Sequence, residues 1–236
     1  MSLLPAEPVP PRIFFEDTVP AIFAGFEFNE AERALDLRLG IVLLPGRGDD
    51  EGGAWTLHFV EGELGIVEGR SEDCELTVIQ SVADWRAVLW EGRPALVAEI
   101  VDRVAESGPE ALRSEPGFLS LRNPEALKGL SEIRGLVEVL VEAGPGDGAG
   151  RGREDGADRD WRLGILVGPG PIPAAPQASI RLGAEQAEAI RRGALHPLEA
   201  LITGQLRLEG DLGLILQLQA VAMTASMPPS PIPPSS

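Results

Sequence analysis

Alternation of apolar and polar residues along the chain predicts a protein built largely from short β-strands. Successive side chains of a strand point to opposite faces, so a half-buried strand shows a period of two. Segment 34–44 alternates and then becomes continuously apolar, and 55–69 predicts two strands that turn near Glu61 and Gly62. Further strands are expected at 74–79, 136–141, 161–167, 178–182 and 205–209.

Helical periodicity fills most intervals between these strands. Segments 82–90 and 94–106 carry apolar residues at spacings of three and four, and Asp84 lies in the opening turn of the first, where it favours the helix dipole. The last helix, 212–221, is apolar on nearly all sides and follows Asp211, its expected N-cap. Other helices are expected at 17–28, 124–134, 184–192 and, as a short one, at 198–202.

Three segments lack the apolar residues that a core needs. Residues 1–12 are rich in proline and are not expected to form a regular element. Segment 144–160 is a low-complexity loop of Gly, Asp and Arg, and the tail from Pro228 has the composition of a polyproline extension. We expect this loop and this tail to add little to stability.

Two passes of the same pattern predict an internal repeat. A strand, a Gly/Asp loop and a Trp-x-Leu strand occur at 41–57 and again at 136–163. An alternating strand then precedes a helix at 74–78 and at 178–182. The pattern predicts two units, divided near 119–123 and related by a pseudo-twofold axis, each with a small, mainly antiparallel sheet covered by helices on one face.

The segment IRRGALHPLEALITGQLRLEGDLGLILQLQAVAM, residues 190–223, carries a family resemblance. Its helix end, short helix, strand, acidic turn and final apolar helix resemble the C-terminal half of sterol carrier protein 2 (SCP2) domains. These are small lipid-binding α+β domains with an apolar tunnel between a sheet and a terminal helix. The resemblance implies an α+β fold of tandem SCP2-like units. The expected parts are an N-terminal arm at 1–12, a degenerate unit at 13–119, a second unit at 120–227 and a tail at 228–236.

The two units differ in ways that bear on such a tunnel. In place of the strand 205–209 and the terminal helix, the first unit has the more polar segment 101–118. In place of the strand pair 55–69, the second has GPGPIPAAP at 168–176, a loop or degraded edge because proline cannot donate to a ladder. The case for a tunnel is therefore weaker in the first unit, and the sheet of the second is expected to be incomplete.

The resemblance implies a lipid-binding pocket in the second unit, lined by the short helix, the strand after it and the terminal helix. An apolar lining with few polar groups suits a sterol or an acyl chain. A closely packed core uses the same residue types, so the sequence leaves a filled core and an open tunnel as alternatives. The residues concerned are Leu198, Leu201, Ile202, Leu206, Leu208, Leu212, Ile215 and Leu216.

Composition and charge disfavour several classes of function. The 37 Asp and Glu against 20 Lys and Arg give a net charge of −17, a field that repels nucleic acid and anionic lipid surfaces. The single cysteine, Cys74, excludes an internal disulfide and a multi-cysteine metal site. No run approaches the roughly 20 apolar residues of a membrane span, so we expect a cytoplasmic protein without integral membrane insertion.

No catalytic constellation emerges from the sequence. His58 and His196 lie in different units without metal-ligand spacing, and a zinc site needs three or four converging ligands. The acidic neighbours Asp73 and Glu75 are expected to raise the pKa of Cys74, which argues against an activated nucleophile.

We therefore expect a non-enzymatic protein, without cofactor or metal, that binds a sterol, a fatty acyl chain or another hydrophobic small molecule. The alternative is a structural or protein-interaction module with filled cavities. The sequence leaves the oligomeric state open.

Overall fold

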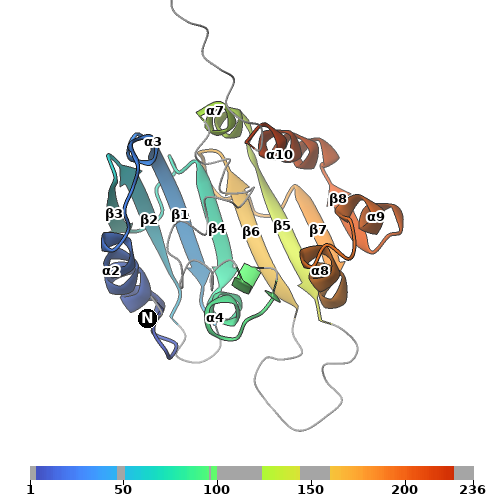
Figure 1. Ribbon diagram of the computed structural model, residues 1–236, viewed down its shortest axis with the longest axis horizontal. Coiled ribbons are helices and arrows are strands. Elements are labelled where there is room, and N and C mark those ends of the chain that lie inside the picture. Colours follow the sequence, from blue (N-terminus) through green and yellow to red (C-terminus); the bar gives the residue numbers. More distant parts are fainter. Residues whose placement is uncertain (1–3, 47–50, 96, 100–123, 144–159, 226–236) are drawn as a thin grey trace, which may run out of the picture.

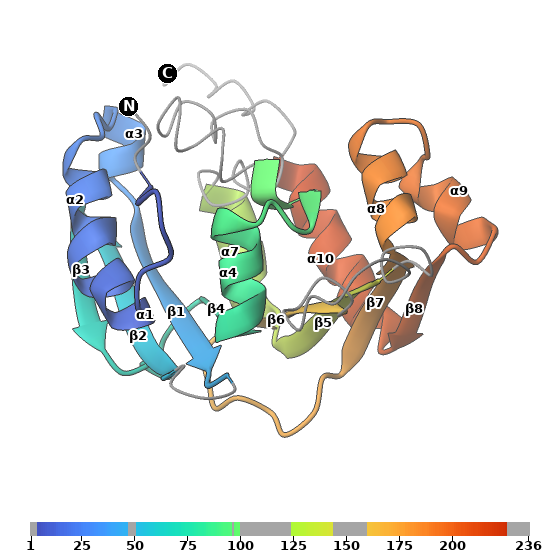
Figure 2. The same ribbon diagram turned by 90° about the horizontal axis from the view of Figure 1, so that it is seen from below.

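The strands pair into one sheet, and the helices lie over one face of it (Figures 1 and 2). The computed structural model describes residues 4–46, 51–95, 97–99, 124–143 and 160–225. Within them, eight strands form a mixed sheet, which confirms the α+β class. The strands are β1 (Asp36–Leu44), β2 (Gly53–Val60), β3 (Glu63–Glu68), β4 (Leu76–Ser81), β5 (Gly135–Glu142), β6 (Trp161–Val167), β7 (Ala178–Gly183) and β8 (Leu206–Gly210).

The order of strands across the sheet is β3-β2-β1-β4-β6-β5-β7-β8, and its two halves share a pattern. β2 pairs antiparallel with β1, which pairs parallel with β4; likewise β6 pairs antiparallel with β5, which pairs parallel with β7. Because β4 and β6 are antiparallel, both sets of three strands also point in the same directions.

Halves with the same order and the same directions are related by a shift along the sheet, whereas a twofold axis would reverse one or the other. The expected pseudo-twofold relation is therefore wrong, and the two expected sheets are joined into one. The origin of the halves as two tandem units stays a prediction.

The pairing of β4 with β6 is the junction between the halves. Leu76 lies opposite Val167 and Val78 opposite Ile165 in this ladder. Two hydrogen bonds continue the contact beyond the end of this ladder. The backbone amide of Gly168 donates to the backbone carbonyl of Glu75 at 2.9 Å, and the guanidinium of Arg70 donates to the carbonyl of Gly170 at 2.8 Å. The expected gap in the second sheet, at 168–176, is thus closed by a strand of the first half.

The helices of the first half include the predicted helix 82–90 and N-terminal helices that begin earlier in the chain than the sequence predicts. They are α1 (Pro11–Ile13), a π-helical stretch η1 (Phe14–Thr18), α2 (Val19–Ala24), α3 (Glu30–Arg33) and α4 (Val82–Trp90). The proline-rich arm does not lack a regular element, because Pro11 occupies the first helical position, where its missing N–H costs nothing. The arm is also docked, since Trp90 donates through Nε1 to the carbonyl of Pro5 at 2.9 Å.

The helices of the second half are α7 (Pro124–Glu132), α8 (Ala184–Arg191), α9 (Pro197–Ile202) and α10 (Leu212–Ala225). They match the predicted segments closely, and Asp211 caps α10 as expected, accepting from the amide of Leu214 at 3.1 Å. Most of the predicted helix 94–106, the unit boundary at 119–123, nearly all of the loop 144–160 and the tail from 228 lie outside the described residues.

Packing at the junction predicts that a glycine in β6 is required. A Cβ added at Gly164 would lie 3.2 Å from the Cβ of Ile79 in β4, whereas one at Gly65 in the edge strand β3 meets nothing closer than 3.9 Å. We expect Gly164→Val to lower the free energy of unfolding by about 1–3 kcal/mol through overpacking. Chemical denaturation measures this change.

The control is Gly65→Val, which should change the unfolding free energy by no more than about 0.5 kcal/mol. Equal effects of the two substitutions would show that β4 and β6 do not press together at this position.

Candidate functional site

Aromatic rings fill the helix-facing side of the first half. Phe15 stacks on Trp55 with ring centroids 4.7 Å apart, and Phe14 meets Trp85 edge to face at 5.2 Å. All four side chains are buried in one cluster with Leu43 and Val82. The N-terminal helices therefore occupy the position where a ligand could otherwise lie against these strands.

In the second half, helices cover the two ends of the strands instead. Figure 1 shows α7 and α10 over one end of these strands and α8 near the other end, with α4 of the first half lying beside β4 and β6. Each of the two helix pairs, α7 with α10 and α4 with α8, forms its own buried cluster with the sheet. The first contains Ile133, Val137, Val167, Ala178 and Leu214, and the second contains Ala87, Val88, Val141, Trp161, Leu182 and Ala187.

Between these clusters runs one row of apolar side chains that remain half-buried. Strand register places Leu163, Val139, Ile180 and Leu208 side by side across β6, β5, β7 and β8. Each of the four is half-buried, whereas Val137 and Val141, the neighbours of Val139 on the same face of β5, are buried. We call these four residues the middle row.

The predicted pocket residues of α9 and α10 are largely exposed. Of the nine exposed large hydrophobic side chains among the described residues, five lie on these two helices. Their exposed fractions are 58% for Leu198, 37% for Leu201, 77% for Ile202, 50% for Leu212 and 63% for Leu216.

The remaining predicted residues are half-buried. Leu206 and Leu208 lie on the helix side of β8, where α9 packs, and Ile215 packs into the cluster beneath α10. The structure thus brings α9 to β8 and α10 to α7 and β7. That these residues line a ligand site stays a prediction.

Arg191 at the end of α8 and His196 before α9 already have polar partners. Arg191 donates to both Glu188 and Glu99, and these hydrogen bonds raise the pKa of its guanidinium above the ordinary value. The same contact with Arg191 lowers the pKa of Glu188. The ring Nδ1 of His196 accepts from the amide of Leu198 at 3.2 Å, so this histidine begins α9.

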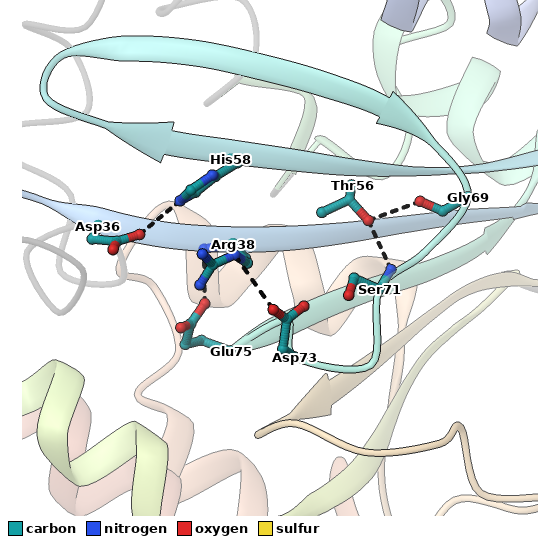
Figure 3. A network of polar contacts seen from close by, with 8 residues as sticks. All are labelled: Asp36, Arg38, Thr56, His58, Gly69, Ser71, Asp73 and Glu75. Carbon is teal, nitrogen blue, oxygen red and sulfur yellow. Dashed lines mark hydrogen bonds and ion pairs between the residues drawn. The ribbon is translucent and has the colours of Figure 1, made fainter.

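A polar network lies on the opposite face of the first half (Figure 3). The ring Nε2 of His58 lies 2.7 Å from Asp36, and Arg38 lies 3.5 Å from Asp73. A hydrogen bond from Ser71, followed by the charge of Arg38, lowers the pKa of Asp73. These contacts fasten the turn before β4 to β1 and β2, which is a structural role.

Cys74 is fully buried beside this network. Burial is the largest cause that raises the pKa of its thiol, and Asp73 and Glu75 add smaller contributions in the expected direction. A buried thiol of raised pKa is a poor nucleophile.

No metal centre or membrane span is found in the part of the chain that the structure describes. Within it, no group of three His, Cys, Asp or Glu side chains is arranged to hold a metal ion. None of the described helices is long and apolar enough to cross a bilayer.

Comparison with known proteins finds a family likeness in part of the second half of the chain. Residues 159–223 match the model of the SCP-2 sterol transfer family. The match runs from the start of β6 into α10 and contains all eight predicted pocket residues. The chain therefore contains an SCP2-like segment, and the first half lies outside the match.

Two solved structures show a weaker likeness. One is sterol carrier protein 2 like 2 of Aedes aegypti, at 18% identity over 54% of this chain and 96% of that one, with a TM-score of 0.29. The other is sterol carrier protein domain 2 of Helicoverpa armigera, at 18% identity over 56% and 93%, with a TM-score of 0.29. At such scores the likeness carries no argument. No curated protein matches the chain.

Sequence reasoning missed three members of the middle row, Val139, Leu163 and Ile180. Each lies in a predicted strand, but a strand pattern shows only which residues share a face. The register across four strands, which aligns them with Leu208, appears only in the folded sheet.

Two leucines of α10 provide a matched pair for testing which residues form the core. Leu214 is 5% exposed within the cluster of α7 and α10, whereas Leu216 is 63% exposed. We expect Leu214→Ala to lower the free energy of unfolding by about 2–5 kcal/mol. Leu216→Ala should change it by no more than about 0.5 kcal/mol. Urea denaturation of both variants checks this, and a large loss for Leu216→Ala would mean that Leu216 is packed in a core.

Proposed function

We propose that the second half of this protein binds a hydrophobic ligand, a sterol, a fatty acyl chain or another lipid, without catalysing a reaction. The observation that carries the proposal is the middle row, a line of apolar side chains that stay half-buried, although Val139 and Leu163 pack against one cluster of the helix face and Ile180 against the other. The match of residues 159–223 to the SCP-2 sterol transfer family supports it.

The exposed leucines of α9 and α10 fit this proposal. α10 is 14 residues long and carries no charged residue, yet Leu212 and Leu216 face solvent. A ligand that lies against the middle row and α10 would remove both surfaces from water. Each buried methylene stabilises by roughly 0.8 kcal/mol, so about ten methylenes correspond to a micromolar dissociation constant before the costs of association.

The second candidate function is a structural or protein-interaction module. The aromatic filling of the first half favours it, because that half shows the same strand pattern with its helix face occupied by Phe14 and Phe15. On this hypothesis, the exposed side chains of α9 and α10 contact another protein and no small ligand enters.

Titration with a fluorescent sterol, dehydroergosterol, tests the proposal. We expect saturable binding by the wild-type protein and an affinity about tenfold lower for Leu216→Gln, since a ligand-facing leucine contributes roughly 1.5–3 kcal/mol when fully buried. Val67→Gln is the control, because Val67 in β3 is 66% exposed, close to the 63% of Leu216. It should bind as the wild type does.

Two results would count against the proposal. Absence of binding by the wild-type protein, both to this sterol and to an acyl ester, would favour the interaction module. An equal loss in both variants would place the sterol away from α10.

A further inference from the structure

We propose that the ligand of this site is an uncharged lipid, such as a sterol, a fatty alcohol or an ester, and not a fatty-acid anion or a phosphate-bearing lipid. This inference rests on the proposed function and specifies its ligand class. It follows from the position of every cation that the structure describes in the second half.

Three arginines of the strands point to the face of the sheet that is opposite the helices and the middle row. Register places Arg162 and Arg181 opposite Leu140, and Arg207 opposite Arg181, in one row across β6, β5, β7 and β8. Side chains alternate between faces, and the row of Leu140 is adjacent to the middle row along each strand, so these arginines point away from the helices. They cannot reach a headgroup on the helix side without crossing the sheet.

The two arginines at the C-terminal end of α8 already form ion pairs with carboxylates. Arg191 contacts Glu188 and Glu99, and Arg192 lies 3.1 Å from Glu188. The positive charges of these two arginines are thus balanced by the negative charges of these two glutamates. A ligand carboxylate would have to displace one of these side chains to gain a partner.

The other described cations of the second half lie at its periphery. Arg134 donates to the carbonyl of Pro169 at 2.6 Å. Lys128 is exposed on α7 next to Gly129, whose added Cβ would meet Val221 at 3.0 Å, near the far end of α10. Val221 is five residues beyond Leu216, about 7.5 Å along the helix axis. Among the described residues of the first half, the arginines nearest along the chain are Arg86 and Arg93, and both already have partners.

The N-terminus of α10, which could otherwise attract an anion, is already capped by a carboxylate of the chain. Such a terminus presents unpaired amides and a partial positive charge. In α10, however, the carboxylate of Asp211 accepts from the amide of Leu214. The exposed acids Glu185 of α8 and Glu199 of α9 add negative charge to the helices around the site. An anionic headgroup would thus be desolvated or repelled without compensation.

A pair of probes with the same chain separates charge from hydrophobicity. We expect the wild-type protein at pH 8 to bind methyl cis-parinarate at least about tenfold more tightly than cis-parinaric acid, which is anionic there. Leu216→Lys should narrow this ratio by placing a cation on α10, whereas Val67→Lys, at a site of similar exposure in the first half, should leave it unchanged.

Equal affinity of the wild-type protein for acid and ester would overturn this inference and leave the proposed function standing. A ratio that Leu216→Lys does not change would also overturn it, because the preference would then not arise from the missing cation on α10. If neither probe nor the fluorescent sterol binds, the proposed function itself fails and this inference with it.

Discussion

The antiparallel pairing of β4 with β6 is the contact on which the rest of the structure depends. A strand at the edge of a sheet exposes unpaired amides and carbonyls. β6 pairs with β5 on one side, but its own half supplies no strand for the other side because 168–176 is too rich in proline and glycine to form one. β4 fills this position. One continuous sheet results, with its helices on a single face (Figure 2).

The two halves then differ in what covers this shared face. In the first, Phe14 and Phe15 pack with Trp55 and Trp85 in one buried cluster, and the partly buried strand residues Ile41, Leu57 and Ile66 pack against it. In the second, α4 and α8 seal one end and α7 and α10 the other, and the middle row between them stays half-buried. The difference arises from the side chains available to fill the space, because α8, α9 and α10 contain no aromatic residue.

Much of the fold could be predicted because its signals are local. The turn at Gly62, whose φ is positive, and the cap at Asp211 follow from residue types that favour those conformations. The sequence does not predict the helix that begins at Pro11, because the burial of Phe14 and Phe15 outweighs the proline-rich context. The site could be predicted only as a set of apolar residues. Their exposure, and the alignment of Val139 with Leu163 and Ile180, depend on pairings between distant segments.

Methyl NMR of the intact protein, labelled at Leu, Val and Ile, tests the central claim most directly during titration with an uncharged acyl ester. An open helix face in the second half predicts shifts at Val139, Leu163, Leu208 and Leu216, while Leu43 beneath the aromatic cluster stays unchanged. Shifts centred on the first half, or none at saturating ester, would contradict it.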